Sequence, residues 1–114
     1  CSVDCGIWVN PIGGNNQAVG CIIDGIGHAM YGDVEFKKGV PNSKNCDKFE
    51  LIRMNQTPKV EVHFVKNDFS PTGLGEPTLP PVGAAISNAI YKAMGVRLYK
   101  QPFSKELKLK TILG

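Results

Sequence analysis

The stretch SPTGLGEPTLPP at residues 70–81 constrains the fold more than any other part of the sequence. It holds four prolines and two glycines, and Glu76 is its only charged residue. Proline removes a backbone donor and glycine weakens regular structure, so this stretch must be a loop between two regular elements. A solvated loop would normally carry more charge. The composition therefore indicates a loop that holds one carboxylate rigidly.

The segments on either side of this loop have clear periodicities. Residues 59–66 alternate, with Val60, Val62 and Phe64 on one side, which predicts a strand. Apolar residues recur at helical spacing through residues 82–95, which predicts a helix that stops at its last residue, a glycine. A further short strand is predicted at residues 96–100.

The N-terminal half predicts a strand at residues 1–9 and a turn at residues 10–16, NPIGGNN. A helix is expected to follow, with Asn15 or Asn16 as its N-cap. Another short strand is predicted at residues 33–39.

Three glycines interrupt the first predicted helix, at Gly20, Gly25 and Gly27. Each lowers the stability of an isolated helix by about 1 kcal/mol relative to alanine. A helix that keeps them is expected to lie close to another backbone or to a ligand.

These elements predict an α+β fold, with a mixed sheet of about four strands and two helices. The chain has 114 residues, of which 42% are hydrophobic and 20% charged, so one packed domain is expected. Residues 1–103 are assigned to this unit. Residues 104–114 are expected to form a basic tail that docks elsewhere or frays.

Composition also excludes several classes of protein. The net charge of +3 is too small to predict nucleic-acid binding, and no apolar run approaches the length of about 20 residues that a membrane span needs. The chain starts at Cys1 without a signal segment, so we expect a piece of a longer protein. Any export signal would lie outside it, which leaves the cytoplasm and the periplasm both open as compartments.

The four cysteines, at positions 1, 5, 21 and 46, do not have the spacing of a zinc or iron–sulfur site. We expect free thiols that act as small hydrophobic residues, and no disulfide framework. His28 and His63 are expected to have structural or solvated positions, since they lie on separate predicted elements.

Glu76 is the strongest candidate for chemistry. A general base must be held still and shielded from water, and Gly75 and Pro77 restrict its backbone while Leu74, Leu79 and Val82 offer apolar walls. The alternative is a solvated glutamate in a surface turn. A second candidate is the glycine-rich loop before the first helix, with Gln17 expected in the first helical turn. It would suit a phosphate or a polar heterocycle, or serve only to cap the helix.

Three stretches of the sequence resemble the molybdopterin-binding subunit of the molybdenum hydroxylases, the family of xanthine dehydrogenase and aldehyde oxidase. They are VDCGIWVNP with Gln17 and Gly20 after it, DGIGHAMYGDVEFKKG, and GLGEPTLPPVGAAISNAIYKAMGVRL. The segments LIRMN and PKVEVHFV are similar to the branch of isoquinoline 1-oxidoreductase β subunits and related bacterial aldehyde dehydrogenases.

The resemblance implies that residues 1–103 are a C-terminal piece of a molybdopterin-binding domain. It implies that Glu76 is the base beside molybdenum when an N-heterocycle is hydroxylated or an aldehyde oxidised, with water as the oxygen source. Gln17 and Gly75 would lie at the molybdenum cofactor. Iron–sulfur clusters would lie on a partner subunit or domain, and the remainder of the molybdopterin-binding subunit would be the other partner. The isolated piece is expected to bind no cofactor and to be inactive. A non-catalytic anion-binding or assembly module that kept the fold is the alternative.

Overall fold

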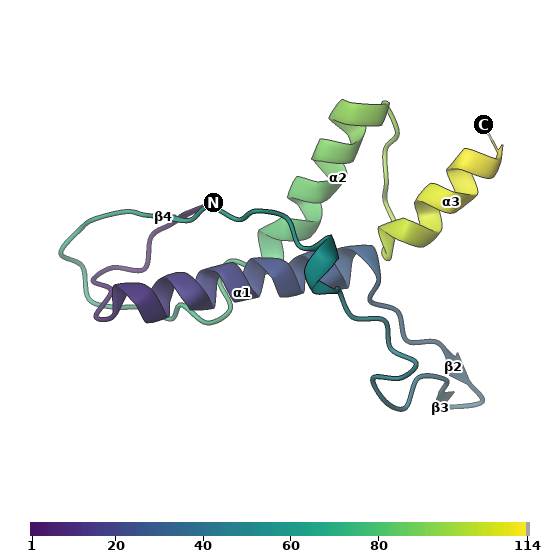
Figure 1. Ribbon diagram of the computed structural model, residues 1–114, viewed down its shortest axis with the longest axis horizontal. Coiled ribbons are helices and arrows are strands. Elements are labelled where there is room, and N and C mark those ends of the chain that lie inside the picture. Colours follow the sequence, from purple (N-terminus) through teal and green to yellow (C-terminus); the bar gives the residue numbers. More distant parts are fainter. Residues whose placement is uncertain (114) are drawn as a thin grey trace.

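The fold is organised around one long helix. The computed structural model describes residues 1–113, and the side chains of residues 1–108. Helix α1 (Pro11–Met30) runs through the molecule, with α2 (Pro80–Met94) rising from its middle and α3 (Phe103–Leu113) close to its C-terminal end (Figure 1). A short 3₁₀ helix, η1 (Met54–Gln56), completes the helical elements of the described residues. Three α-helices form where the sequence predicted two.

Helix α1 begins earlier than predicted. Its N-cap is Asn10, whose side chain accepts a hydrogen bond of 2.9 Å from the N–H of Gly13, and Pro11 occupies the first helical turn. Asparagine at the N-cap and proline just after it are both favourable for a helix start. The segment NPIGGNN therefore forms the cap and the first turns of α1, and the prediction of a turn with Asn15 or Asn16 as N-cap is wrong.

Helix α2 matches the sequence closely, whereas α3 forms where only a basic tail was expected. Helix α2 ends at Gly95, which adopts a left-handed conformation with φ 70° and donates its N–H to Tyr91 at 2.8 Å. Helix α3 occupies the tail, and Phe103 at its start packs in a small core with Ala29 and Leu98. The predicted basic tail covers residues 104–114, and its side chains from residue 109 on lie outside the described part of the structure.

The strands are short and form two separate pairs. Strand β1 (Ser2–Val3) runs parallel to β4 (His63–Phe64), and β2 (Phe36–Lys37) pairs antiparallel with β3 (Val40–Pro41) through Lys38 and Gly39, both at positive φ. This arrangement replaces the predicted mixed sheet of about four strands, so the fold is a small mixed one with three helices.

Residues 96–100 do not form the predicted strand, because side chains satisfy their backbone groups. Ser87 on α2 donates its hydroxyl proton to the carbonyl of Leu98 at 3.0 Å. The carboxylate of Glu106 on α3 accepts the N–H groups of Tyr99 and Lys100 at 2.9 and 2.8 Å. The segment is thus an extended connection held between α2 and α3.

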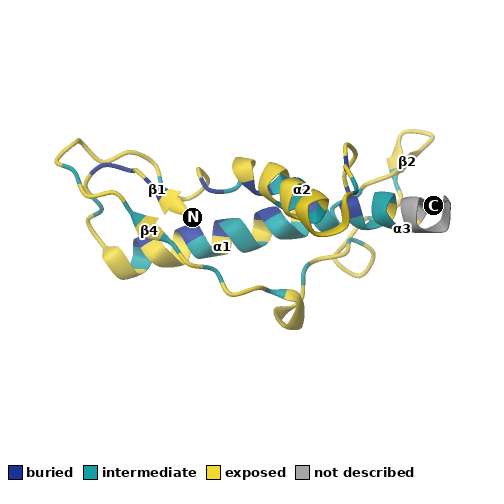
Figure 2. Cartoon of the chain, turned by 90° about the horizontal axis from the view of Figure 1, so that it is seen from above, coloured by how far each residue is buried: buried dark blue, intermediate teal, exposed yellow. Residues whose placement is uncertain are grey.

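The described chain is open, with much of its surface exposed (Figure 2). Its radius of gyration is 16.8 Å, whereas a compact domain of this length has about 13 Å. Its accessible surface is 8344 Å², against about 6,100 Å² for a compact protein of 12.3 kDa. Large apolar side chains are among those exposed, namely Val9, Ile12, Phe36, Met54, Phe69 and Tyr99. An exposed apolar surface of this kind is typical of a region that contacts another part of a protein.

Candidate functional site

The loop that carries Glu76 lies along α1 and is anchored at three points. At one end the side chain of Leu74 fills the space over Gly14, where an added Cβ would lie 3.0 Å from Leu74 Cδ2. In the middle, the hydroxyl of the buried Thr78 donates a hydrogen bond of 3.1 Å to the carbonyl of Ala18.

The third anchor is at the start of α2. An added Cβ at Gly25 would lie 3.0 Å from Val82 Cβ and 3.3 Å from the carbonyl oxygen of Leu79. Gly27 likewise lies against Ile52, at 3.2 Å from its Cγ2. The predicted close approach at the α1 glycines is therefore confirmed at these two positions. Gly20 has nothing within 4 Å and faces a pocket instead.

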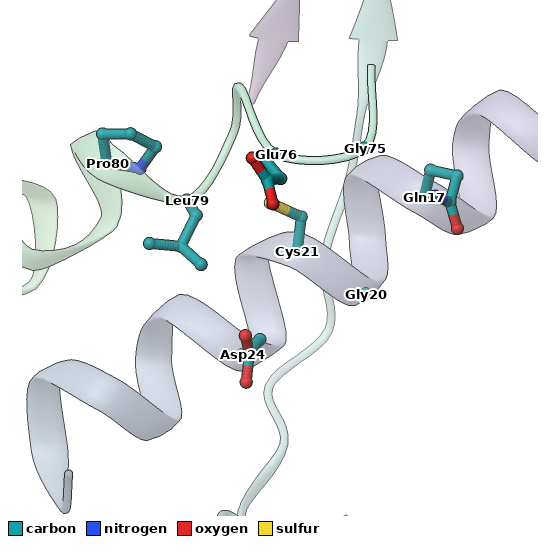
Figure 3. Close-up of a pocket in the computed structure, with 8 residues that line it drawn as sticks. All are labelled: Gln17, Gly20, Cys21, Asp24, Gly75, Glu76, Leu79 and Pro80. Carbon is teal, nitrogen blue, oxygen red and sulfur yellow. The ribbon is translucent and has the colours of Figure 1, made fainter. Parts of the chain in front are cut away.

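This pocket lies between the loop and α1 and has a volume of about 610 Å³. Figure 3 shows the carboxylate of Glu76 directed from the loop toward the part of α1 that carries Cys21. The residues that line the pocket are Gln17, Gly20, Cys21, Asp24, Gly75, Glu76, Leu79 and Pro80.

The structure brings together all three residues that the sequence analysis singled out. Gln17 and Glu76 line the same pocket, and an added Cβ at Gly75 would lie 3.5 Å from Gln17 Nε2. Gln17 lies in the second turn of α1 and not in the first, because the helix starts at Pro11. Gln17 and Glu76 therefore lie on the same edge of the fold.

The shielding of Glu76 differs from the expectation. Its side chain is exposed in the described chain, because Leu74 and Val82 pack onto the glycines of α1 and only Leu79 faces the pocket with it. The walls that would exclude water from the carboxylate are not supplied by these residues.

Sequence reasoning missed Asp24 and Cys21 in the pocket wall. Both follow from Gln17 once α1 is known, since residues three, four and seven positions apart share a helix face. Asp24 lies 3.5 Å from His28 Nε2, one helical turn away, and both side chains are more than half exposed. His28 therefore lies in a surface pair with Asp24, and His63 is exposed to solvent as expected.

The chemistry of the pocket is that of hydrogen-bond donors beside carboxylates. The side-chain amide of Gln17 and the N–H groups of Gly75 and Glu76 form no hydrogen bond within the described part of the chain. Asp24 and Glu76 add two carboxylates, and no lysine or arginine lines the pocket. Such a wall suits the edge of a neutral heterocycle that offers both donors and acceptors, such as a pterin, and disfavours an anion.

The remaining candidates have no comparable surroundings. Among residues 1–113, no three histidine, cysteine, aspartate or glutamate side chains are grouped as a metal site would need. The four cysteines are free; Cys5 and Cys21 are buried as expected, whereas Cys1 and Cys46 are exposed and do not act as small hydrophobic residues. No helix in the described part is both long and apolar enough to cross a membrane.

Curated proteins similar to the chain include a membrane-bound aldehyde dehydrogenase (pyrroloquinoline-quinone) of Gluconacetobacter polyoxogenes, 36% identical over 88% of the chain and 13% of the relative. The β subunit of isoquinoline 1-oxidoreductase from Brevundimonas diminuta is 33% identical over 94% of the chain and 14% of the relative. A putative xanthine dehydrogenase molybdenum-binding subunit of Escherichia coli is 32% identical over 89% of the chain and 14% of the relative. The chain thus spans about a seventh of the length of these relatives.

The fold agrees with this similarity. Quinoline 2-oxidoreductase from Pseudomonas putida superposes with a TM-score of 0.77 at 19% identity, over 98% of the chain and 15% of that structure. No family model matches the chain. The relatives that match nearly its whole length nevertheless include the isoquinoline oxidoreductase subunit and the xanthine dehydrogenase subunit that the sequence resembles. These similarities identify the chain as a segment of the molybdenum hydroxylase family.

Proposed function

We propose that this segment belongs to the molybdopterin-binding subunit of an enzyme that hydroxylates an N-heterocycle or oxidises an aldehyde. Water supplies the oxygen atom, and Glu76 is the base. The observation that supports the proposal most strongly is the convergence of Gln17, Gly75 and Glu76 on one pocket, although Gln17 lies far from the other two in sequence.

Glu76 acts by accepting a proton at its carboxylate. Its position is fixed from both sides, since Leu74 packs over Gly14 and Thr78 bonds to Ala18. A proton acceptor that is held in place loses less conformational freedom when the reacting group arrives. The remainder of the subunit closes over the exposed carboxylate and excludes water from it.

Gln17 and Gly75 hold the cofactor. The molybdenum cofactor, when bound, supplies the oxygen-transfer and electron-accepting chemistry that no side chain offers. The free amide of Gln17 donates and accepts hydrogen bonds at the pterin edge, and Gly75 leaves the backbone open to close approach. Because the described residues group no ligand set for a metal, the cofactor would have to supply the ligands of the molybdenum itself.

The segment works with other protein parts. Residues 1–103 form a C-terminal piece of the cofactor domain, and α3, which forms the tail, packs on this same piece through Phe103 and Glu106. Electrons leave through iron–sulfur clusters on a partner subunit or domain. Because the pocket is open and Glu76 is exposed, the 114-residue chain alone binds no cofactor stably and is inactive.

The direct test is to purify the full-length polypeptide that contains residues 1–114, together with its co-purifying partners. Molybdenum and iron are measured by mass spectrometry and quinone cofactors by chromatography, because one relative is named for pyrroloquinoline quinone. Turnover of aldehydes and N-heterocycles is then assayed in isotopically labelled water. Stoichiometric molybdenum with label in the product supports the proposal. A quinone without molybdenum overturns it.

A further inference from the structure

The outer edge of β4 is unpaired in a segment whose sequence predicts a longer strand. Residues 59–66 alternate throughout, yet only His63–Phe64 form a regular strand. The inner edge is used: the N–H of His63 donates to Cys1 and that of Val65 donates to Val3, both at 2.8 Å. Backbone groups of an extended segment point alternately to its two edges, so Val62 and Phe64 direct theirs away from β1.

These outward groups have no partner in the described chain. The N–H groups of Val62 and Phe64 form no hydrogen bond with any residue of the described range. Backbone N–H and C=O groups nearly always find partners when they are buried, and a two-stranded pair is only marginally stable in water. An unblocked edge of this kind is a template for one more strand.

The side chains of residues 59–66 already alternate between a half-buried face and an exposed face, as a central strand would require. Val60, Val62 and Phe64 are half-buried, and the ring of Phe64 meets Trp8 edge-on with centroids 4.2 Å apart. Phe64 also lies 3.9 Å from the position of an added Cβ at Gly14, so this face covers the start of α1. A strand added to the free edge would widen this layer beside β4.

The surface that the described chain leaves exposed is large enough for a permanent interface with another part of a protein. The accessible surface of 8344 Å² exceeds that of a compact protein of this mass by about 2,200 Å². The curated relatives are about seven times longer than the stretch that matches. A buried area of this order is typical of permanent contacts between parts of one protein, and exceeds that of most transient ones.

We infer that an extended strand from the remainder of the longer polypeptide pairs with β4 at Val62 and Phe64. Its apolar side chains alternate so that one set faces α1 beside Val62 and Phe64. The inference rests on the proposed membership of a longer subunit, but it does not depend on the cofactor or on Glu76. Its failure is therefore distinguishable from failure of the proposed reaction.

Residue-resolved hydrogen exchange in the full-length polypeptide tests the pairing. His63 and Val65 serve as internal references, because their amides are already bonded to β1. If a strand pairs with the outer edge, the amides of Val62 and Phe64 should exchange within about tenfold of the rates of these two references. Much faster exchange of Val62 and Phe64 would overturn the inference.

A proline substitution gives a second test. Val62→Pro removes the outward N–H, whereas Val62→Ala trims the same side chain and keeps it. Proline is tolerated at an edge position whose N–H faces solvent. If the edge is paired, Val62→Pro in the full-length polypeptide should melt measurably below Val62→Ala, because only the proline removes the paired N–H. Equal melting temperatures contradict pairing.

Discussion

The hydroxyl of Thr78 donates a hydrogen bond of 3.1 Å to the backbone carbonyl of Ala18, and this contact ties the loop before α2 to the middle of α1. Thr78 is only 4% exposed and lies two residues after Glu76. The bond therefore sets the distance between the candidate base and the helix face that carries Gln17. Its loss should disturb the site before it disturbs the fold.

Thr78→Val should lower stability modestly. The hydroxyl is lost, but the carbonyl of Ala18 lies within α1 and keeps its helical partner, so the cost is about 0.5–1.5 kcal/mol. Chemical denaturation of the full-length polypeptide measures it. Thr78→Ser keeps the hydroxyl and serves as the control; a serine variant that is as unstable as the valine variant would show that the methyl group and not the bond matters.

Gly25→Ala and Gly20→Ala should change stability in opposite directions. Alanine gains up to about 1 kcal/mol in a helix relative to glycine. At Gly25 the new Cβ meets Val82 Cβ at 3.0 Å and a backbone oxygen at 3.3 Å, and overpacking of this kind costs about 1–3 kcal/mol, so a net loss is expected.

Gly20 has open space around it, so Gly20→Ala should be neutral or stabilising. Thermal unfolding of both variants in the same polypeptide gives the comparison. Stabilisation by both substitutions would mean that α2 does not approach α1 as closely as the structure has it.

Lys105 should link α3 to the β2–β3 hairpin in a pH-dependent way. Its ammonium donates hydrogen bonds to Asp33 and, at 3.0 Å, to Glu35. The hydrogen bond to Asp33, followed by that to Glu35, raises the pKa of Lys105 above 10.5. Because the folded pKa is raised, the stabilisation is fully present below pH 10.5 and is lost as the pH rises through the folded value.

Lys105→Met should therefore be less stable than the parent protein at neutral pH, and the stability difference should close as the pH rises through the raised pKa of Lys105. The side chain is exposed, so salt should also narrow this difference. Chemical unfolding at two pH values and two ionic strengths measures this. If the stability difference between Lys105→Met and the parent protein persists unchanged at high pH, it comes from packing and not from the charge of Lys105.

The sequence predicted those features of the fold that depend on a single residue and its near neighbours. The end of α2 at Gly95 and the close packing at Gly25 and Gly27 were predictable because each depends on one residue type. The start of α1 is also set locally, by Asn10 and Pro11, but the glycines that follow them favoured a turn in the prediction.

The extent of the strands, in contrast, could not be predicted from local signals. Alternation at residues 59–66 correctly predicted which side chains are half-buried, but strand length depends on a hydrogen-bonding partner that the sequence pattern does not specify. In the same way Gln17, Gly75 and Glu76 could be chosen from the sequence, whereas Asp24 in the same pocket became visible only once α1 was in place.

The most direct test of the account is Glu76→Gln in the full-length enzyme, compared with Glu50→Gln, which changes the charge of an exposed residue outside the pocket. Molybdenum content and turnover are measured on the same preparations. If Glu76 is the base, kcat should fall by at least about 100-fold with normal molybdenum content, while Glu50→Gln remains close to the parent enzyme. Turnover of the Glu76→Gln enzyme at the parent rate would contradict the account.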